Sequence, residues 1–250
     1  MNRVLVVLSG GQDSTTCLFW AIEGWGVNNV HAVTYDYNQR HAIEIEAAVK
    51  VASLAGITAR HSIVEIGHIL QGSSPLVSNE TLAQYPDMHS LPGGLEKTYV
   101  PGRNMLFATL AANHAYARGI TDIVMGVCQA DSAGYPDCRQ DFIDSVESAI
   151  RLGFGYDDND PFSKFTIHAP LMDLTKAETV LRAYYMPPCW EALAYTHTSY
   201  DGQYPPTGMD HATLLRAKGF FEADLPDPLI LRAVREGLMD IPGDANYRGR

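Results

Sequence analysis

The chain has 250 residues, 46% of them hydrophobic, and a formal net charge of −11. This length allows one full hydrophobic core, and the acidic balance excludes a basic surface of the kind that binds duplex nucleic acid or anionic lipid. No apolar run approaches the ~18 residues that a membrane-spanning helix needs, and the apolar N-terminal segment is too short for a secretory signal. None of the four cysteines forms a CxxC pair, so we expect reduced thiols and a cytoplasmic protein.

Short apolar runs alternate with stretches of helical spacing along the first three quarters of the chain. The apolar runs predict buried strands at residues 3–9, 30–37, 60–66, 122–127 and 165–171. The helical spacing predicts helices at residues 13–23, 42–54, 103–118 and 142–152. The sequence TKAE at residues 175–178 predicts a capping box that opens a further helix. Residues 70–98 show no period, which indicates a long excursion over the surface.

Strands that alternate with helices indicate an α/β fold with a Rossmann-like, doubly wound parallel sheet. We expect this domain to span residues 1–186. From residue 187 onward proline, glycine and aromatic residues become more frequent, and we expect a small, mainly helical C-terminal lobe at residues 187–250.

The loop LSGGQDSTTC, at residues 8–17, joins the first predicted strand to the first predicted helix. Ligands of open parallel sheets bind beyond the carboxyl ends of the strands, where this loop is expected to lie. Gly10 and Gly11 let the backbone approach an anion closely, and the following helix presents unpaired N–H groups. The loop lacks the lysine of a Walker loop and the spacing of a dinucleotide fingerprint. We interpret it as a phosphate-binding loop; the alternative is an ordinary glycine turn.

The motif SGGxDS resembles the PP-loop of ATP pyrophosphatases, which cleave ATP between its α and β phosphates. Further blocks resemble the 7-cyano-7-deazaguanine synthases, the QueC family, in the same order and with similar spacing. They are VTYDYNQRHAIEIE (33–46), TYVPGRNMLFATLAANHAYA (98–117), GVCQADSAGYPDCRQDFI (126–143) and APLMDLTKAET (169–179). The resemblance runs nearly from end to end.

This resemblance implies an ATP-dependent carbon–nitrogen ligase that converts 7-carboxy-7-deazaguanine and ammonia to the nitrile 7-cyano-7-deazaguanine. The acid is activated as an acyl adenylate, ammonia converts it to the amide, and a second ATP activates the amide before AMP leaves. The resemblance also implies ATP with Mg²⁺, small-molecule partners without nucleic acid or membrane, and a homodimer. One alternative is a related PP-loop enzyme that stops at the amide or joins the acid to another amine. Another is a non-catalytic, ligand-binding homologue.

The resemblance and the chemistry of the loops predict the residues of the site. We expect ATP to contact Leu8, Ser9, Gly10, Gly11, Gln12, Asp13, Ser14, Thr15, Thr34, Tyr35, Gly102 and Arg103. We expect catalysis to depend on Ser9, Asp13, Ser14, Arg103 and Lys176. Asp13 either ligates Mg²⁺ or caps the first helix, and Lys176 is either functional or only part of the capping segment.

The deazaguanine substrate is expected to contact Tyr37, Gln39, Arg40, Cys128, Asp131, Tyr135 and Asp137. Carboxylates accept hydrogen bonds from the N–H groups of a guanine-like edge, and a tyrosine ring stacks on the base. Each of these segments also has a purely structural interpretation. Residues 40–41 would be a solvated helix start, the segment before residue 103 an ordinary Pro-Gly turn, and residues 126–139 a plain polar loop.

The C-terminal region departs from the resembled family, which carries four zinc cysteines there, in the segments SCY and CGxCxxC. In this chain Ser199, Thr207, Asp210 and Thr213 occupy those positions. Hydroxyl groups are poor zinc ligands, so we expect no structural zinc. A substitute set is disfavoured because two of its members are adjacent in sequence; the set is Cys189, His197, Asp210 and His211. We expect packing to hold the lobe together, through Tyr200, Tyr204, Leu214, Leu215 and Phe220.

Overall fold

The structure is a computed structural model of the chain. It describes residues 2–38, 43–70, 74–78, 80–91, 94–129, 134–206 and 208–248. Four of the residues that the sequence analysis singled out lie outside this part of the chain: Gln39, Arg40, Asp131 and Thr207.

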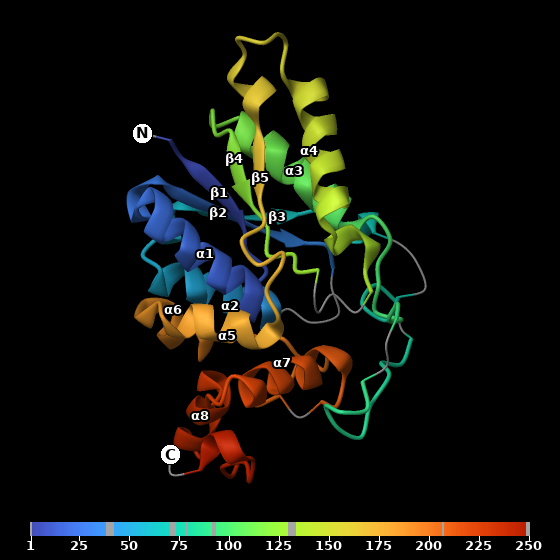
Figure 1. Cartoon of the computed structure of the whole chain (residues 1–250), viewed down its shortest axis with the longest axis vertical. Coiled ribbons are helices and arrows are strands. Elements are labelled where there is room, and N and C mark those ends of the chain that lie inside the picture. Colours follow the sequence, from blue (N-terminus) through green and yellow to red (C-terminus); the bar gives the residue numbers. More distant parts are fainter. Residues whose placement is uncertain are drawn as a thin grey trace.

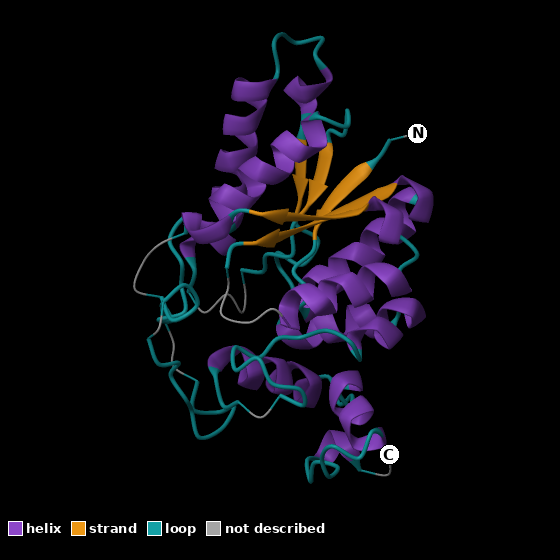
Figure 2. Cartoon of the chain, turned by 180° about the vertical axis from the view of Figure 1, so that it is seen from behind, coloured by secondary structure: helices purple, strands orange, loops and turns teal. Residues whose placement is uncertain are grey.

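A parallel sheet forms the centre of the molecule, with the strand order β3-β2-β1-β4-β5 (Figure 2). The strands are β1 (Val4–Val7), β2 (Val30–Asp36), β3 (His61–Glu65), β4 (Asp122–Val124) and β5 (Thr166–His168). All five predicted strands are confirmed, although β4 and β5 are shorter than expected. After β4, Gly126 packs against residues 13–14, at the start of the helix that follows β1, where an added Cβ would lie 3.0 Å from the Ser14 nitrogen.

Helices cover both faces of the sheet, which confirms the doubly wound α/β fold (Figures 1 and 2). One face carries α1 (Gln12–Trp25), α2 (Ile43–Leu54), α5 (Lys176–Tyr184) and α6 (Pro187–Leu193). The other face carries α3 (Arg103–Tyr116) and α4 (Gln140–Phe154). Alternate residues of β1 point to the two faces: Val4 and Val6 pack in the first core, and Leu5 packs in the second. This alternation explains why the strand reads as an unbroken apolar run.

The chain ends with α7 (His211–Glu222) and α8 (Pro228–Arg235), which lie beyond α5 and α6 (Figure 1). Short 3₁₀ turns occur at Val27–Asn29, Thr58–Arg60, Gly67–Ile69, Pro136–Cys138, Pro161–Lys164 and Ala245–Tyr247. Leu193 of α6 and Phe220 of α7 are buried in the same core as α1, so a domain boundary at residue 187 stays a prediction. None of the described helices is long and apolar enough to cross a membrane.

The predicted capping box at the start of α5 is confirmed. The Glu178 N–H donates to the Thr175 hydroxyl at 3.2 Å, and the Thr175 N–H donates to the Glu178 carboxylate at 2.8 Å. This reciprocal pair fixes the point at which α5 begins. Lys176 is therefore held at the first helical position, beside the loop that follows β1.

Candidate active site

A cavity of about 320 Å³ lies at the carboxyl ends of the central strands. Its walls come from the loop after β1, the ends of β2 and β4, the start of α3, residues 197–200 and the start of α7. This is the position that open parallel sheets use for ligands, and the volume falls in the range of small-molecule sites.

The loop after β1 forms one wall of this cavity. Ser9, Gly11, Gln12, Asp13 and Ser14 line it. The Ser9 N–H donates to the Ser14 hydroxyl at 3.1 Å, so the loop closes on itself. Gly11 is the N-cap of α1 and provides no side-chain cap, which leaves the first N–H groups of the helix available to an anion.

Gly10 lies behind this wall rather than on it. Its φ angle is +84°, and an added Cβ would overlap the Glu44 carbonyl oxygen and lie 2.7 Å from the Ala48 nitrogen. The backbone of α2 therefore packs directly against the loop. Glycine is required here by both the conformation and the contact.

Lys176 and Asp13 form an ion pair at the mouth of the loop. The lysine Nζ donates to both carboxylate oxygens of Asp13, at 2.8 and 3.1 Å. Because Gly11 is the N-cap of α1, Asp13 does not cap that helix, and its alternative role as a Mg²⁺ ligand stays a prediction. Lys176 lines the cavity while Thr175 and Glu178 form the capping box, so its side chain has a contact beyond the capping segment.

Arg103 lines the opposite side of the cavity, at the first residue of α3. Gly102, in a left-handed conformation, is the N-cap of this helix. The Arg103 guanidinium donates a hydrogen bond to the Tyr37 hydroxyl, and burial raises the pKa of Tyr37 to about 12 despite this positive neighbour. No carboxylate in the described part of the chain forms an ion pair with Arg103. Its guanidinium therefore adds a positive charge to the cavity wall.

Glu44 is a cavity residue that the sequence reasoning missed. Burial raises the pKa of its carboxyl to about 7, against the opposing effect of Arg103. A signal was present in the sequence, because Glu44 precedes the buried residues of α2 by three, four, seven and eight positions; these are Ala47, Ala48, Val51 and Ala52. A carboxyl on the buried stripe of a helix indicates either a buried partner or a site.

Two further cavity residues carry unpaired polar atoms. The Gln12 amide nitrogen and the Tyr35 hydroxyl are buried and have no hydrogen-bond partner among the described residues. Unpaired buried donors are rare in folded proteins and are expected where a ligand completes the bonding. The Thr34 hydroxyl differs, because it donates to the Leu8 carbonyl at 2.6 Å and thereby ties β2 to the loop.

The four predicted substrate residues within the described ranges divide into two groups. Tyr37, Cys128 and Tyr135 line the cavity. Asp137 does not: it is only 5% exposed, and its carboxylate accepts the Asn104 N–H at 3.3 Å, at the start of α3. Within the predicted nucleotide set, the residues absent from the cavity wall are Gly10, Thr15 and Gly102.

The C-terminal wall reaches the loop through a backbone contact. The His197 N–H donates to the Gly10 carbonyl at 3.0 Å, and Tyr200 and His211 line the cavity nearby. Among the positions where the resembled family has zinc cysteines, the Ser199 and Thr213 hydroxyls both donate to the Asp210 carboxylate.

A parallel sheet that offers SGGxDS, a lysine and an arginine to one cavity defines a nucleotide-binding α/β protein of the PP-loop type. The family model for "Queuosine biosynthesis protein QueC" matches residues 3–224. This chain belongs to the QueC family.

Three similar proteins are each named 7-cyano-7-deazaguanine synthase. The protein from Gloeobacter violaceus is 49% identical over 92% of this chain and 96% of its own length. The proteins from Chromobacterium violaceum and Laribacter hongkongensis are both 44% identical, over 94% and 92% of this chain and 96% and 95% of their own lengths. Among solved structures, NMN synthetase from Francisella tularensis covers 98% of this chain and 80% of its own, with a TM-score of 0.45 and 12% identity. That likeness is too distant to inform the site.

Proposed function

We propose that this chain is an ATP-dependent ligase that makes 7-cyano-7-deazaguanine from 7-carboxy-7-deazaguanine and ammonia. One observation carries the proposal: the PP-loop, Lys176 and Arg103 line a single cavity. An anion-binding loop and two cations suit a reaction between a triphosphate and a carboxylate, both of which are negative. Relatives at 44–49% identity that carry this name support the choice of acid.

The residues of the loop are proposed to bind the phosphates of ATP. The N–H groups at the start of α1 and the hydroxyls of Ser9 and Ser14 donate to the pyrophosphate that leaves. Lys176 and Arg103 reduce the repulsion between ATP and the incoming carboxylate. The Asp13 carboxylate is an oxygen donor of the type that Mg²⁺ takes, and it would hold an ATP-bound Mg²⁺ that neutralises phosphate charge.

The proposed reaction passes through two adenylates. A carboxylate oxygen attacks the α phosphorus of ATP, and pyrophosphate leaves. Ammonia adds to the carbonyl carbon, AMP leaves and the amide forms. The amide oxygen attacks the α phosphorus of a second ATP, and AMP then leaves as the carbon–nitrogen triple bond forms. The nitrogen loses all of its protons along this sequence, so a proton acceptor is needed beside it.

Glu44 is the proposed proton acceptor. It lines the cavity, and its pKa of about 7 gives it both a basic form and a protonated form near neutral pH. Asp13 also lines the cavity, but its carboxylate accepts two hydrogen bonds from Lys176. Glu44 accepts no hydrogen bond from a residue in the described ranges and is therefore open to the reacting nitrogen.

The test is incubation of the purified chain with 7-carboxy-7-deazaguanine, Mg·ATP and ammonium, followed by mass analysis of the product. The nitrile with two AMP per turnover is expected. The amide alone would favour the enzyme that stops at the first activation, and bound ligand without ATP turnover would favour the non-catalytic homologue. We also propose the homodimer that the family resemblance implies, and size measurement in solution tests it.

A paired substitution tests the site itself. Lys176→Met keeps most of the side-chain volume but removes the charge next to Asp13, and AMP release is expected to fall by roughly 100-fold or more. Lys218→Met is the control, because among the described residues Lys218 makes only a surface pair with Glu222 at 3.7 Å. Equal activity of the two variants would contradict the assignment of the cavity.

A further inference from the structure

Asp210 is a buried carboxylate at the centre of a hydrogen-bond network in the C-terminal lobe. It is 1% exposed and is the N-cap of α7. Its Oδ1 accepts the Thr213 N–H at 3.1 Å, and its Oδ2 accepts the Thr213 hydroxyl at 2.8 Å. The same Oδ2 accepts the Ser199 hydroxyl at 3.0 Å and the Tyr200 N–H at 3.4 Å. We call these four residues the Asp210 network.

The Asp210 network contains three of the positions at which the resembled family carries its zinc cysteines. The donors present here do not fit zinc. Structural zinc is held by thiolate sulfur or imidazole nitrogen, whereas these side chains offer two neutral hydroxyls and one carboxylate. Both hydroxyls already donate to that carboxylate, so a metal would have to displace them.

Histidine and cysteine do not complete a zinc site in the described part of the chain. The His197 ring nitrogen Nε2 pairs with the Ser199 carbonyl at 2.6 Å. Cys189 is fully buried in the core that α1 and α6 share. No group of three histidine, cysteine or acidic residues in the described ranges could hold a metal ion.

The loop before α7 also closes directly over the network. A Cβ added to Gly208 would lie 2.8 Å from Asp210 Oδ2 and 3.0 Å from the Ser199 hydroxyl oxygen. Any larger residue at position 208 would therefore push the loop away from the carboxylate. The small residue and the carboxylate form one close-packed unit.

The network connects the two parts of the chain that form the C-terminal wall of the cavity. Ser199 and Tyr200 belong to the segment that reaches Gly10 through His197, and Thr213 belongs to α7. A metal at these positions would join the same two segments. The carboxylate joins them with four hydrogen bonds, one of which also satisfies an N–H at the start of the helix.

We propose that the Asp210 carboxylate takes the structural place of the family's zinc ion, and that the C-terminal lobe of this chain is stable without a metal. The proposal goes beyond the catalytic function and does not depend on it, because its tests measure metal content and stability. It adds a polar network to the expectation that side-chain packing holds the lobe together.

The first test is the metal content of the untagged, full-length protein from cells grown with added zinc. We expect far less than one zinc, calcium or magnesium ion per chain, and a melting temperature that EDTA does not change. About one ion of any of these metals per chain, together with a lower melting temperature after chelation, would overturn the proposal.

The second test uses substitutions and thermal unfolding. Asp210→Ala is expected to lower the melting temperature by roughly 5 °C or more, because it leaves buried donors without an acceptor. Asp240→Ala, at an exposed position in the same lobe, is the control and should have no effect. If Asp210→Ala does not fold, Thr213→Val removes one donor at nearly constant volume and should lower the melting temperature by roughly 2–4 °C. Unchanged melting in a folded Asp210→Ala, or in Thr213→Val where it replaces that variant, would refute the role of the network.

Discussion

Gly10→Ala should separate the folding of the PP-loop from its binding function. The substitution places a methyl group where the loop contacts α2. This methyl would overlap the Glu44 carbonyl oxygen and lie 2.7 Å from the Ala48 nitrogen. Because both neighbours are backbone atoms of a helix, neither can rotate away as a flexible side chain would. The loop and the helix must therefore move apart.

Two effects add to the expected loss of stability. At a φ angle of +84°, a residue with a Cβ destabilises the folded state by roughly 1–2 kcal/mol relative to glycine. Overpacking of a close-packed contact adds roughly 1–3 kcal/mol. The free energy of unfolding should therefore fall by about 2–5 kcal/mol, which corresponds to about 5–15 °C in the melting temperature of a chain of this size.

Gly11→Ala is the matched control. Its added Cβ would lie 3.5 Å from the His197 carbonyl oxygen and 3.6 Å from the Ser9 hydroxyl oxygen, which are ordinary contacts. Its φ angle of −82° suits any residue. We expect this variant to melt within roughly 4 °C of the wild type, because alanine is a poorer N-cap than glycine, and to bind ATP more weakly, because the methyl group lies on the cavity wall.

The assays are thermal and urea unfolding without ligand, and calorimetric titration with ATP. A Gly10→Ala protein that melts within roughly 2 °C of the wild type would refute the contact between loop and helix on which the argument rests. Equal destabilisation by both substitutions would show that the loop is sensitive to any side chain.

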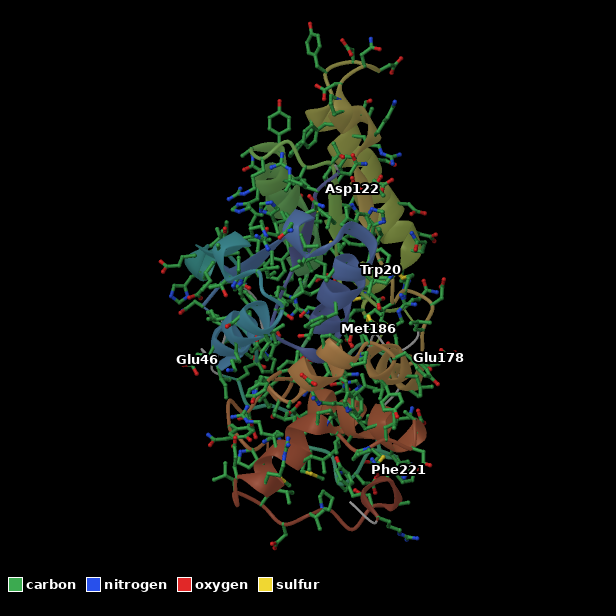
Figure 3. All side chains as sticks on the ribbon, turned by 90° about the vertical axis from the view of Figure 1, so that its left-hand side faces the viewer. Trp20, Glu46, Asp122, Glu178, Met186 and Phe221 are labelled. Atoms are coloured by element: carbon green, nitrogen blue, oxygen red, sulfur yellow. The ribbon has the colours of Figure 1, made fainter. Side chains whose placement is uncertain are left out.

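In the wild type, the reaction rate should rise with pH as the Glu44 carboxyl loses its proton around pH 7. Glu44→Gln should remove this rise. Glu46→Gln is the control, at the outer edge of the molecule in Figure 3, and should leave the pH–rate profile unchanged. A raised carboxyl pKa means that the folded state favours the protonated form, so the stability of the wild type falls as the pH rises from about 4.3 to about 7. At pH 8, Glu44→Gln should therefore unfold at a higher urea concentration than the wild type. At pH 4, its urea midpoint should not be higher than that of the wild type. Urea midpoints that shift equally at both values would contradict the assigned pKa. Arg216→Met should lower the free energy of unfolding by about 3–5 kcal/mol, because it strips the buried Asp227 carboxylate of the two hydrogen bonds, at 2.6 and 2.9 Å, from its guanidinium. A loss below about 1 kcal/mol in urea unfolding would show that water reaches this carboxylate.

The order of the strands and helices could be read from the sequence because local patterns report burial. Apolar runs such as residues 3–9 fit a strand covered on both faces, and the capping box at Thr175 and Glu178 marks a helix start through contacts three residues apart. Most predicted boundaries are near the observed ones. The late ends predicted for β4 and β5 arose because apolar residues continue beyond the last paired position.

The candidate site could be predicted where a motif carries its own chemistry. The glycines and serines after β1 indicate a phosphate loop, and the sheet places that loop at its carboxyl edge. The contact between Asp13 and Lys176 joins residues 163 positions apart, and no local pattern indicates it. Asp137 illustrates the converse: its motif predicts a substrate contact, which stays a prediction, whereas the folded chain shows its carboxylate accepting the backbone N–H of Asn104 at the start of α3.

The amino-acid sequence was sufficient for the fold class, the PP-loop and the loss of the zinc cysteines, because each is a property of residue types at short spacing. The roles proposed for Glu44 and Asp210 depend on the folded chain. A carboxylate is exposed, paired or buried according to the groups that surround it, and those groups come from distant segments: Arg103 near Glu44, and Ser199 and Tyr200 near Asp210. Burial raised the pKa of Glu44, whereas four donors gathered by the fold made Asp210 a structural centre.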